Sequence, residues 1–91
     1  MKLRMHAFVS GLVQGVFFRS ETRRVAKNLN VKGWIRNLSD GRVEVLAEGE
    51  KENIDKLIEF LKVGPSAATV DKVDIKTESF KNEFNDFEIR Y

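Results

Sequence analysis

The chain combines two hydrophobic periods, and the order in which they follow one another limits the folds it can adopt. Four stretches alternate apolar and polar residues, as half-buried strands do. Two stretches repeat apolar residues every three or four positions, as amphipathic helices do. The alternating stretches are 2–9, 42–48, 73–77 and 87–91, and the helical ones are 20–29 and 50–62. Residues 34–38 are expected to form a further strand. Such a chain is expected to build a sheet that is covered by helices.

Turn and capping residues separate these segments. Gly11 is expected to end the first strand, and Ser20 is expected to cap the first helix at its N-terminus. The Ser39-Asp40-Gly41 sequence is typical of a hairpin between the second and third strands. Residues 63–66 contain Gly and Pro and should end the second helix, and residues 81–86 should form a polar loop.

The resulting order is β-α-β-β-α-β with a short strand at the C-terminal end. This order predicts an α+β fold of the ferredoxin-like type, a sandwich in which two helices cover one face of a single, largely antiparallel sheet. A chain of 91 residues has room for one hydrophobic core. We therefore expect a single domain over residues 1–91.

Composition excludes several classes of site. The chain has no cysteine, so disulfides, thiolate nucleophiles and cysteine-based metal sites are ruled out. The net charge is only +2 and acids are interspersed with bases, which gives no indication of nucleic-acid binding. The first six residues carry charges where a signal peptide needs an apolar run, and no stretch is apolar enough to span a membrane. We expect a cytoplasmic protein without membrane or nucleic-acid partners, and we expect it to be a monomer.

The stretch 11–19 lies between the first strand and the first helix. It contains two glycines, few polar side chains and a terminal arginine, so its useful chemistry is mostly that of its backbone. Such a loop can turn several N–H groups to one side and add the guanidinium of Arg19. Together these groups can hold a small oxyanion.

The expected topology brings a second polar residue to the same edge of the sheet. In a split βαβ unit the first two strands run parallel, and the third strand lies between them. Their C-terminal ends, near Gly11 and near Asn37, are then about 10 Å apart, since two inter-strand spacings separate them. Because an arginine side chain spans much of that gap, Arg19 and Asn37 can address one ligand.

This pair of residues limits the chemistry. The loop lacks the lysine and hydroxyl residue of a Walker loop, and Val13 stands where a phosphatase of the C-x5-R type needs its cysteine. A site of amides, one arginine and one carboxamide has no strong base and no metal ligands. Transfer of a phosphoryl group from a mixed carboxylic–phosphoric anhydride to water suits it, because the carboxylate leaves without a general acid. Arg19 would hold the phosphoryl oxygens and Asn37 would orient the water.

Two segments resemble the signatures of the acylphosphatase family. Residues 9–19, VSGLVQGVFFR, are similar to the first signature, and residues 33–43, GWIRNLSDGRV, followed by Gly49, are similar to the second. Counted through to Gly49, the two segments span about a third of the chain, and its length and element order agree with the family. Ile35 departs from the pattern, which favours a smaller residue there, and we expect it to affect packing near Asn37 rather than the chemistry.

The resemblance implies hydrolysis of acyl phosphates to a carboxylate and inorganic phosphate, without a metal or a cofactor. It implies that Arg19 is the phosphate ligand, that Asn37 orients the water, and that the phosphate itself accepts the proton of the water. The implied phosphate-binding loop consists of Gln14, Gly15, Val16, Phe17, Phe18 and Arg19.

Two other functions fit the same fold. A non-catalytic phosphate-binding or anion-binding regulatory module would use the same loop amides. An RNA-binding module is less favoured, because it needs aromatic residues in the third strand and residues 42–46 have none. His6 lies in the middle of a strand with no polar cluster near it in sequence, so we expect a surface or packing role. Of Phe17 and Phe18, one is expected in the core and the other beside the site.

Overall fold

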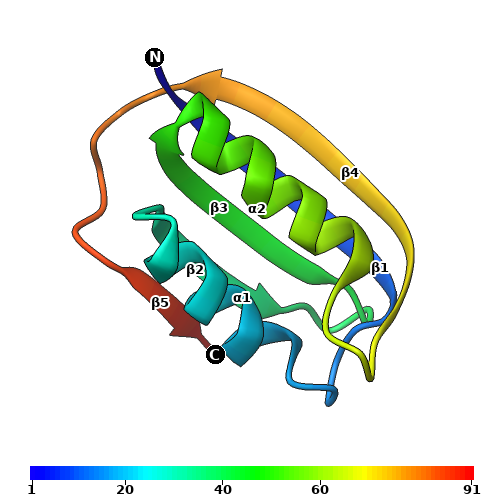
Figure 1. Ribbon diagram of the computed structural model, residues 1–91. Helices are drawn as coiled ribbons and strands as arrows, with labels where there is room; N and C mark the ends of the chain where they lie inside the picture. The colour runs from blue at the N-terminus through cyan, green and yellow to red at the C-terminus, as the bar shows by residue number, and fades with distance from the viewer.

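One five-stranded sheet and two helices account for most of the chain. The structure, a computed structural model, describes residues 1–91 (Figure 1). In chain order the elements are β1 (Lys2–Leu12), α1 (Phe18–Asn28), β2 (Lys32–Asn37), β3 (Val43–Glu50), α2 (Lys51–Val63), β4 (Thr69–Ser79) and β5 (Phe87–Arg90).

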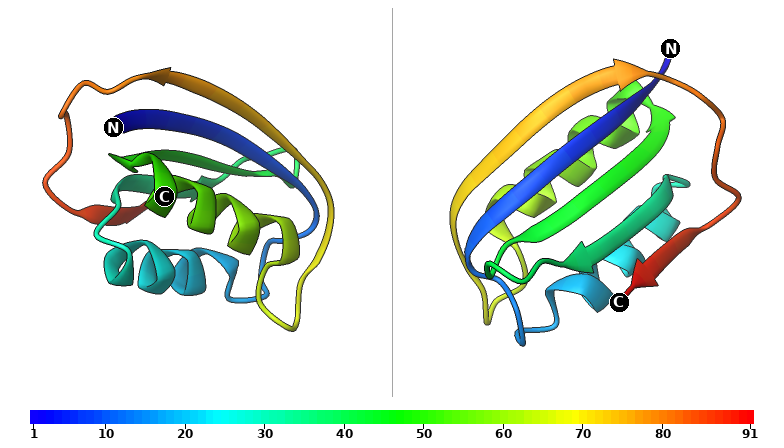
Figure 2. Two further views of the ribbon diagram at one scale, coloured as in Figure 1. Left: turned by 45° about the horizontal axis from the view of Figure 1, so that its top comes forward. Right: turned by 180° about the vertical axis from the view of Figure 1, so that it is seen from behind.

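The sheet has the strand order β4-β1-β3-β2-β5. Strand β3 pairs antiparallel with both β1 and β2, so β1 and β2 run parallel to each other with β3 between them. Strand β4 is antiparallel to β1, and β5 is parallel to β2. Both helices lie on one face of the sheet, and the view from behind shows the other face without them (Figure 2). The predicted ferredoxin-like arrangement is confirmed.

The core lies between the sheet and the helices. Side chains alternate along the strands, so Met5, Ala7 and Val9 of β1 are buried on the same face as Val43, Val45 and Ala47 of β3. Helix α2 buries Ile54, Leu57 and Leu61 against them, at the spacing of one helical face. The two periods seen in the sequence therefore mark the core correctly.

Several predicted boundaries were wrong. Strand β1 does not end at Gly11 but continues to Leu12 past an irregularity between Ser10 and Gly11, where its register with β4 shifts. Gly11 has a φ of 129°, and a Cβ there would lie 2.2 Å from the carbonyl oxygen of Thr69. The residue is needed for close approach within the sheet, not for ending the strand.

The N-cap prediction was also wrong. Helix α1 begins at Phe18, with Phe17 in the N-cap position and no side-chain cap. Ser20 therefore lies inside the first turn, where its hydroxyl donates a hydrogen bond to the carbonyl oxygen of Phe17 at 3.2 Å. Gly64 does end α2, as predicted.

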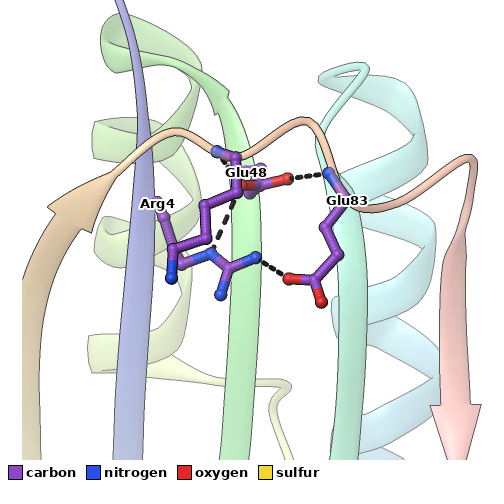
Figure 3. Close-up of polar contacts among 4 residues, drawn as sticks. Arg4, Glu48 and Glu83 are labelled. Atoms are coloured by element: carbon purple, nitrogen blue, oxygen red, sulfur yellow. Dashed lines mark hydrogen bonds and ion pairs between the residues drawn. The ribbon is translucent and has the colours of Figure 1, made fainter.

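A buried carboxylate fastens the 80–86 loop to the sheet (Figure 3). Glu48 of β3 accepts hydrogen bonds from the backbone N–H groups of Lys81 at 2.6 Å and Glu83 at 2.9 Å. It also accepts one from Arg4 Nε at 3.2 Å, while Arg4 Nη2 pairs with the Glu83 carboxylate. Burial raises the pKa of Glu48, but these hydrogen bonds outweigh burial and leave the pKa below its usual value. Because this loop leads into β5, the cluster helps to place β5 beside β2.

Candidate active site

A cavity of about 290 Å³ lies at the end of the sheet where β1 and β2 both terminate. Its walls come from the segment that joins β1 to α1, the first turn of α1, the end of β2 and the C-terminal residues. The lining residues are Val13, Gly15, Phe17, Phe18, Arg19, Ser20, Asn37, Ile89 and Tyr91. Figure 1 places the C-terminal end of the chain beside the start of α1. We call residues 13–17 the cavity loop.

Arg19 and Asn37 line this cavity together, as the strand topology led us to expect. Arg19 is the second residue of α1, half-buried, at the positive end of the helix dipole. Asn37 is the last residue of β2. It lies two positions beyond Ile35, whose side chain is fully buried, so its own side chain points to the helix-covered face of the sheet. The cavity opens on that face.

The backbone of the cavity loop suits an anion. Gly15 has a φ of 73° and Phe17 a φ of 65°, so two residues of this short loop are left-handed. Left-handed residues in a turn make concavities in which successive N–H groups turn to one side. The first N–H groups of a helix have no partner within the helix, and in α1 no side chain caps them either. Loop and helix start together therefore offer N–H groups of the kind that bind a small anion.

Two residues of the implied phosphate-binding loop do not line the cavity. Gln14 instead donates two hydrogen bonds from Nε2, to the carbonyl oxygen of Leu38 at 2.7 Å and to that of Arg42 at 2.9 Å. The side chain of Val16 packs against the core. Gln14 therefore braces the cavity loop against the β2–β3 turn, which begins directly after Asn37. Sequence reasoning missed this role, because the turn lies 24 to 28 residues away in the chain.

The carboxamide of Asn37 has an unused acceptor. Its Oδ1 atom is buried and has no hydrogen-bond donor in the protein, a property it shares only with Thr22 Oγ1. A buried polar atom without a partner costs about 1 to 3 kcal/mol, so native structures keep few of them. Because Oδ1 is enclosed, the N–H end of the carboxamide is the end that faces the cavity.

Phe17 and Phe18 separate as predicted. Phe18 is only 1 % exposed and belongs to the core, whereas Phe17 is 77 % exposed at the mouth of the cavity. Ser20 lines the cavity too, but its hydroxyl is bonded to the backbone and no base lies near it.

His6 has polar neighbours in space that its sequence neighbours do not indicate. Its Nε2 lies 2.6 Å from Glu44 Oε2, and Arg36 Nε donates to Glu44 Oε1 at 2.7 Å. Burial raises the pKa of Glu44, but these two partners leave it lowered. The cluster lies on the face of the sheet opposite Asn37, because Arg36 and Asn37 are consecutive in a strand. Only the cross-strand pairing of Arg36 with Glu44, and of Glu44 with β1, reveals it.

Among the side chains that line it, the cavity thus has one guanidinium and one carboxamide, and no carboxylate or imidazole. No cluster of three or more His, Asp or Glu side chains is placed to hold a metal ion. Neither helix is long and apolar enough to cross a membrane.

Comparison with known proteins gives one consistent result. The model of the acylphosphatase family matches residues 5–89. An acylphosphatase of Syntrophus aciditrophicus is 46 % identical over 91 residues, which cover all of this chain and 95 % of that protein. An acylphosphatase of Acaryochloris marina is 55 % identical over 85 residues, covering 93 % of this chain and 90 % of the relative. The solved structure of an acylphosphatase from Coxiella burnetii superposes with a TM-score of 0.92 at 42 % identity, covering 98 % of this chain and 93 % of that one.

Proposed function

The chain belongs to the acylphosphatase family, whose enzymes hydrolyse acyl phosphates, and on that premise we propose how its own residues carry out the reaction. Arg19 and the N–H groups of the cavity loop and of the first turn of α1 hold the phosphoryl oxygens. Asn37 orients the attacking water. The observation that carries the proposal is that Arg19 and Asn37 line one cavity that contains no general base.

The step is a direct transfer of the phosphoryl group to water. The water oxygen forms a bond to phosphorus while the bond between phosphorus and the acyl oxygen breaks, and the electron pair of that bond leaves on the carboxylate. The proton of the water passes to a phosphoryl oxygen, since no side chain in the cavity is placed to accept it. Catalysis then consists of positioning and of stabilising the charge on the transferring group.

Asn37 can fix the direction of attack. Its Nδ2–H donates to one lone pair of the water, which leaves the other lone pair free to approach phosphorus. The guanidinium of Arg19 offers two parallel N–H groups, a geometry that matches two phosphoryl oxygens. Neither role requires a metal ion, and the side chains that line the cavity offer no carboxylate or imidazole ligand for one.

Isotope labelling tests the step directly. The protein is incubated with benzoyl phosphate in ¹⁸O-labelled water containing EDTA, and both products are examined by mass spectrometry. We expect hydrolysis at the full rate, with the label in inorganic phosphate and none in benzoate. Label in benzoate would mean attack at the carbonyl carbon, and loss of activity with EDTA would mean that a metal takes part. Either result would overturn the proposed mechanism.

A further inference from the structure

The exposed rim of the cavity carries apolar side chains. Six large hydrophobic side chains of the molecule are exposed, and two of them, Phe17 and Tyr91, line this cavity. Phe17 is 77 % exposed and Tyr91 is 98 % exposed, while Ile89 forms an apolar wall beside them. Two exposed aromatic rings gathered at one cavity form the kind of apolar surface that ligand sites present.

The backbone of Phe17 strengthens this argument. With φ at 65° and ψ at 18°, it is left-handed, a conformation that a large side chain adopts with strain. Glycine would fill the position without strain, as it does at Gly15. Strained residues that persist in a structure concentrate at functional sites. The chain therefore keeps an aromatic ring at a position where both the backbone and the solvent disfavour it.

The Tyr91 ring lies next to the group that holds phosphate. The guanidinium carbon of Arg19 is 5.0 Å from the centre of that ring, within the range of a cation–π contact. The polar and apolar parts of the cavity are thus immediate neighbours. A molecule with a phosphoryl group at one end and an apolar group at the other would contact both.

We propose that Phe17 and Tyr91 form an acyl-binding subsite that favours aromatic acyl groups over small ones such as acetyl. This inference rests on the proposed function. In an in-line displacement the leaving group points away from the attacking water. The water is held at Asn37, whose Oδ1 is buried, so the acyl group points outward, where the two exposed rings stand. A benzoyl ring packs there against Phe17, and an acetyl group is too short to do so.

Two substrates and a few variants test the subsite. The quantity measured is kcat/KM for benzoyl phosphate divided by kcat/KM for acetyl phosphate. Phe17→Ala keeps a similar backbone strain but lacks the ring, and we expect its ratio to fall about fivefold, which is the effect of one lost aromatic pair. Phe17→Trp keeps a ring and should retain the ratio. Val63→Ala shortens an exposed side chain outside the cavity and serves as the matched control, with no change in the ratio.

The outcomes separate this inference from the proposed function. If the unmodified protein hydrolyses both substrates and Phe17→Ala leaves the ratio unchanged, the acyl-binding subsite is wrong while the hydrolase stands. If the unmodified protein hydrolyses neither substrate, the proposed function fails and the subsite fails with it. Since Phe17 is largely exposed, Phe17→Ala is expected to fold, and a circular dichroism spectrum checks this.

Discussion

Replacing Gln14 by methionine removes the two side-chain hydrogen bonds that join the cavity loop to the β2–β3 turn. Methionine has nearly the same length and volume, so the change removes the polar contacts and keeps the packing. The two bonds, at 2.7 Å and 2.9 Å, end on the carbonyl oxygens of Leu38 and Arg42. Leu38 directly follows Asn37. The brace therefore sets the position of Asn37, the proposed water-orienting residue, relative to the loop proposed to hold phosphate.

The structure gives a magnitude for the change. Leu38 O still accepts from Gly41 N–H at 3.2 Å, and Arg42 O still accepts from Leu38 N–H at 2.8 Å. Neither carbonyl is left without a donor, so the loss is that of two ordinary hydrogen bonds, about 1 to 2 kcal/mol in total. For a domain of this size that lowers Tm by about 5 to 10 °C. Looser placement of Asn37 should lower kcat by about tenfold or more, because displacements of an ångström are costly in catalysis.

Thermal unfolding and steady-state hydrolysis of benzoyl phosphate measure the two effects. Asn28→Met is the control, because Asn28 is an exposed carboxamide without a hydrogen bond, and its Tm should change by no more than a surface substitution allows. Suppose Gln14→Met kept the Tm and kcat of the unmodified protein. The brace would then have no role in placing Asn37, and the reasoning would be refuted.

Two further predictions concern stability. Glu48 has a folded-state pKa below its unfolded value, so the stability it contributes is present above the unfolded pKa and is lost as the pH falls through the folded pKa. Tm should therefore drop on acidification below about pH 5. Glu48→Gln should lower the free energy of unfolding by about 2 kcal/mol at pH 7, and its Tm should fall less on acidification. An equal acid-dependent fall of Tm in both proteins would contradict this role of Glu48. Gly33 has a φ of 146°, and a Cβ there would lie 1.9 Å from the carbonyl oxygen of Leu46. Gly33→Ala should therefore lower the free energy of unfolding, measured with urea, by about 3 kcal/mol or more. Gly41 is the control, because it has a φ of 96° and no atom near its Cβ position. Gly41→Ala should lower the free energy of unfolding by only about 1 to 2 kcal/mol. Equal losses in the two variants would show that the contact with Leu46 has no effect.

The sequence was sufficient for the parts of the fold that depend on periodicity. The alternation of Met5, Ala7 and Val9 and the helical spacing of Ile54, Leu57 and Leu61 both mark buried faces, and their order implies that β1 and β2 are parallel. That relation was enough to place Arg19 and Asn37 at one edge of the sheet.

Features that depend on contacts across the chain were not visible. The partners in the Arg4–Glu48–Glu83 and His6–Glu44–Arg36 clusters come from separate strands and loops, so no local pattern records them. The start of α1 was misplaced for a related reason. The backbone of Phe17 turns into the helix three residues before the hydroxyl that looked like a cap, and a left-handed phenylalanine has no signature in the sequence.

The division of roles between Arg19 and Asn37 is the central claim, and one comparison tests it most directly. For Arg19→Ala and Asn37→Ala, kcat for benzoyl phosphate and the dissociation constant of inorganic phosphate, from calorimetric titration, are measured side by side. Arg19→Ala should weaken phosphate binding and abolish turnover. Asn37→Ala should lower kcat by about a hundredfold to a thousandfold, as removal of a preorganised donor does, while phosphate still binds with nearly unchanged affinity. Small and equal effects of the two substitutions on both quantities would contradict the account and place the active site elsewhere.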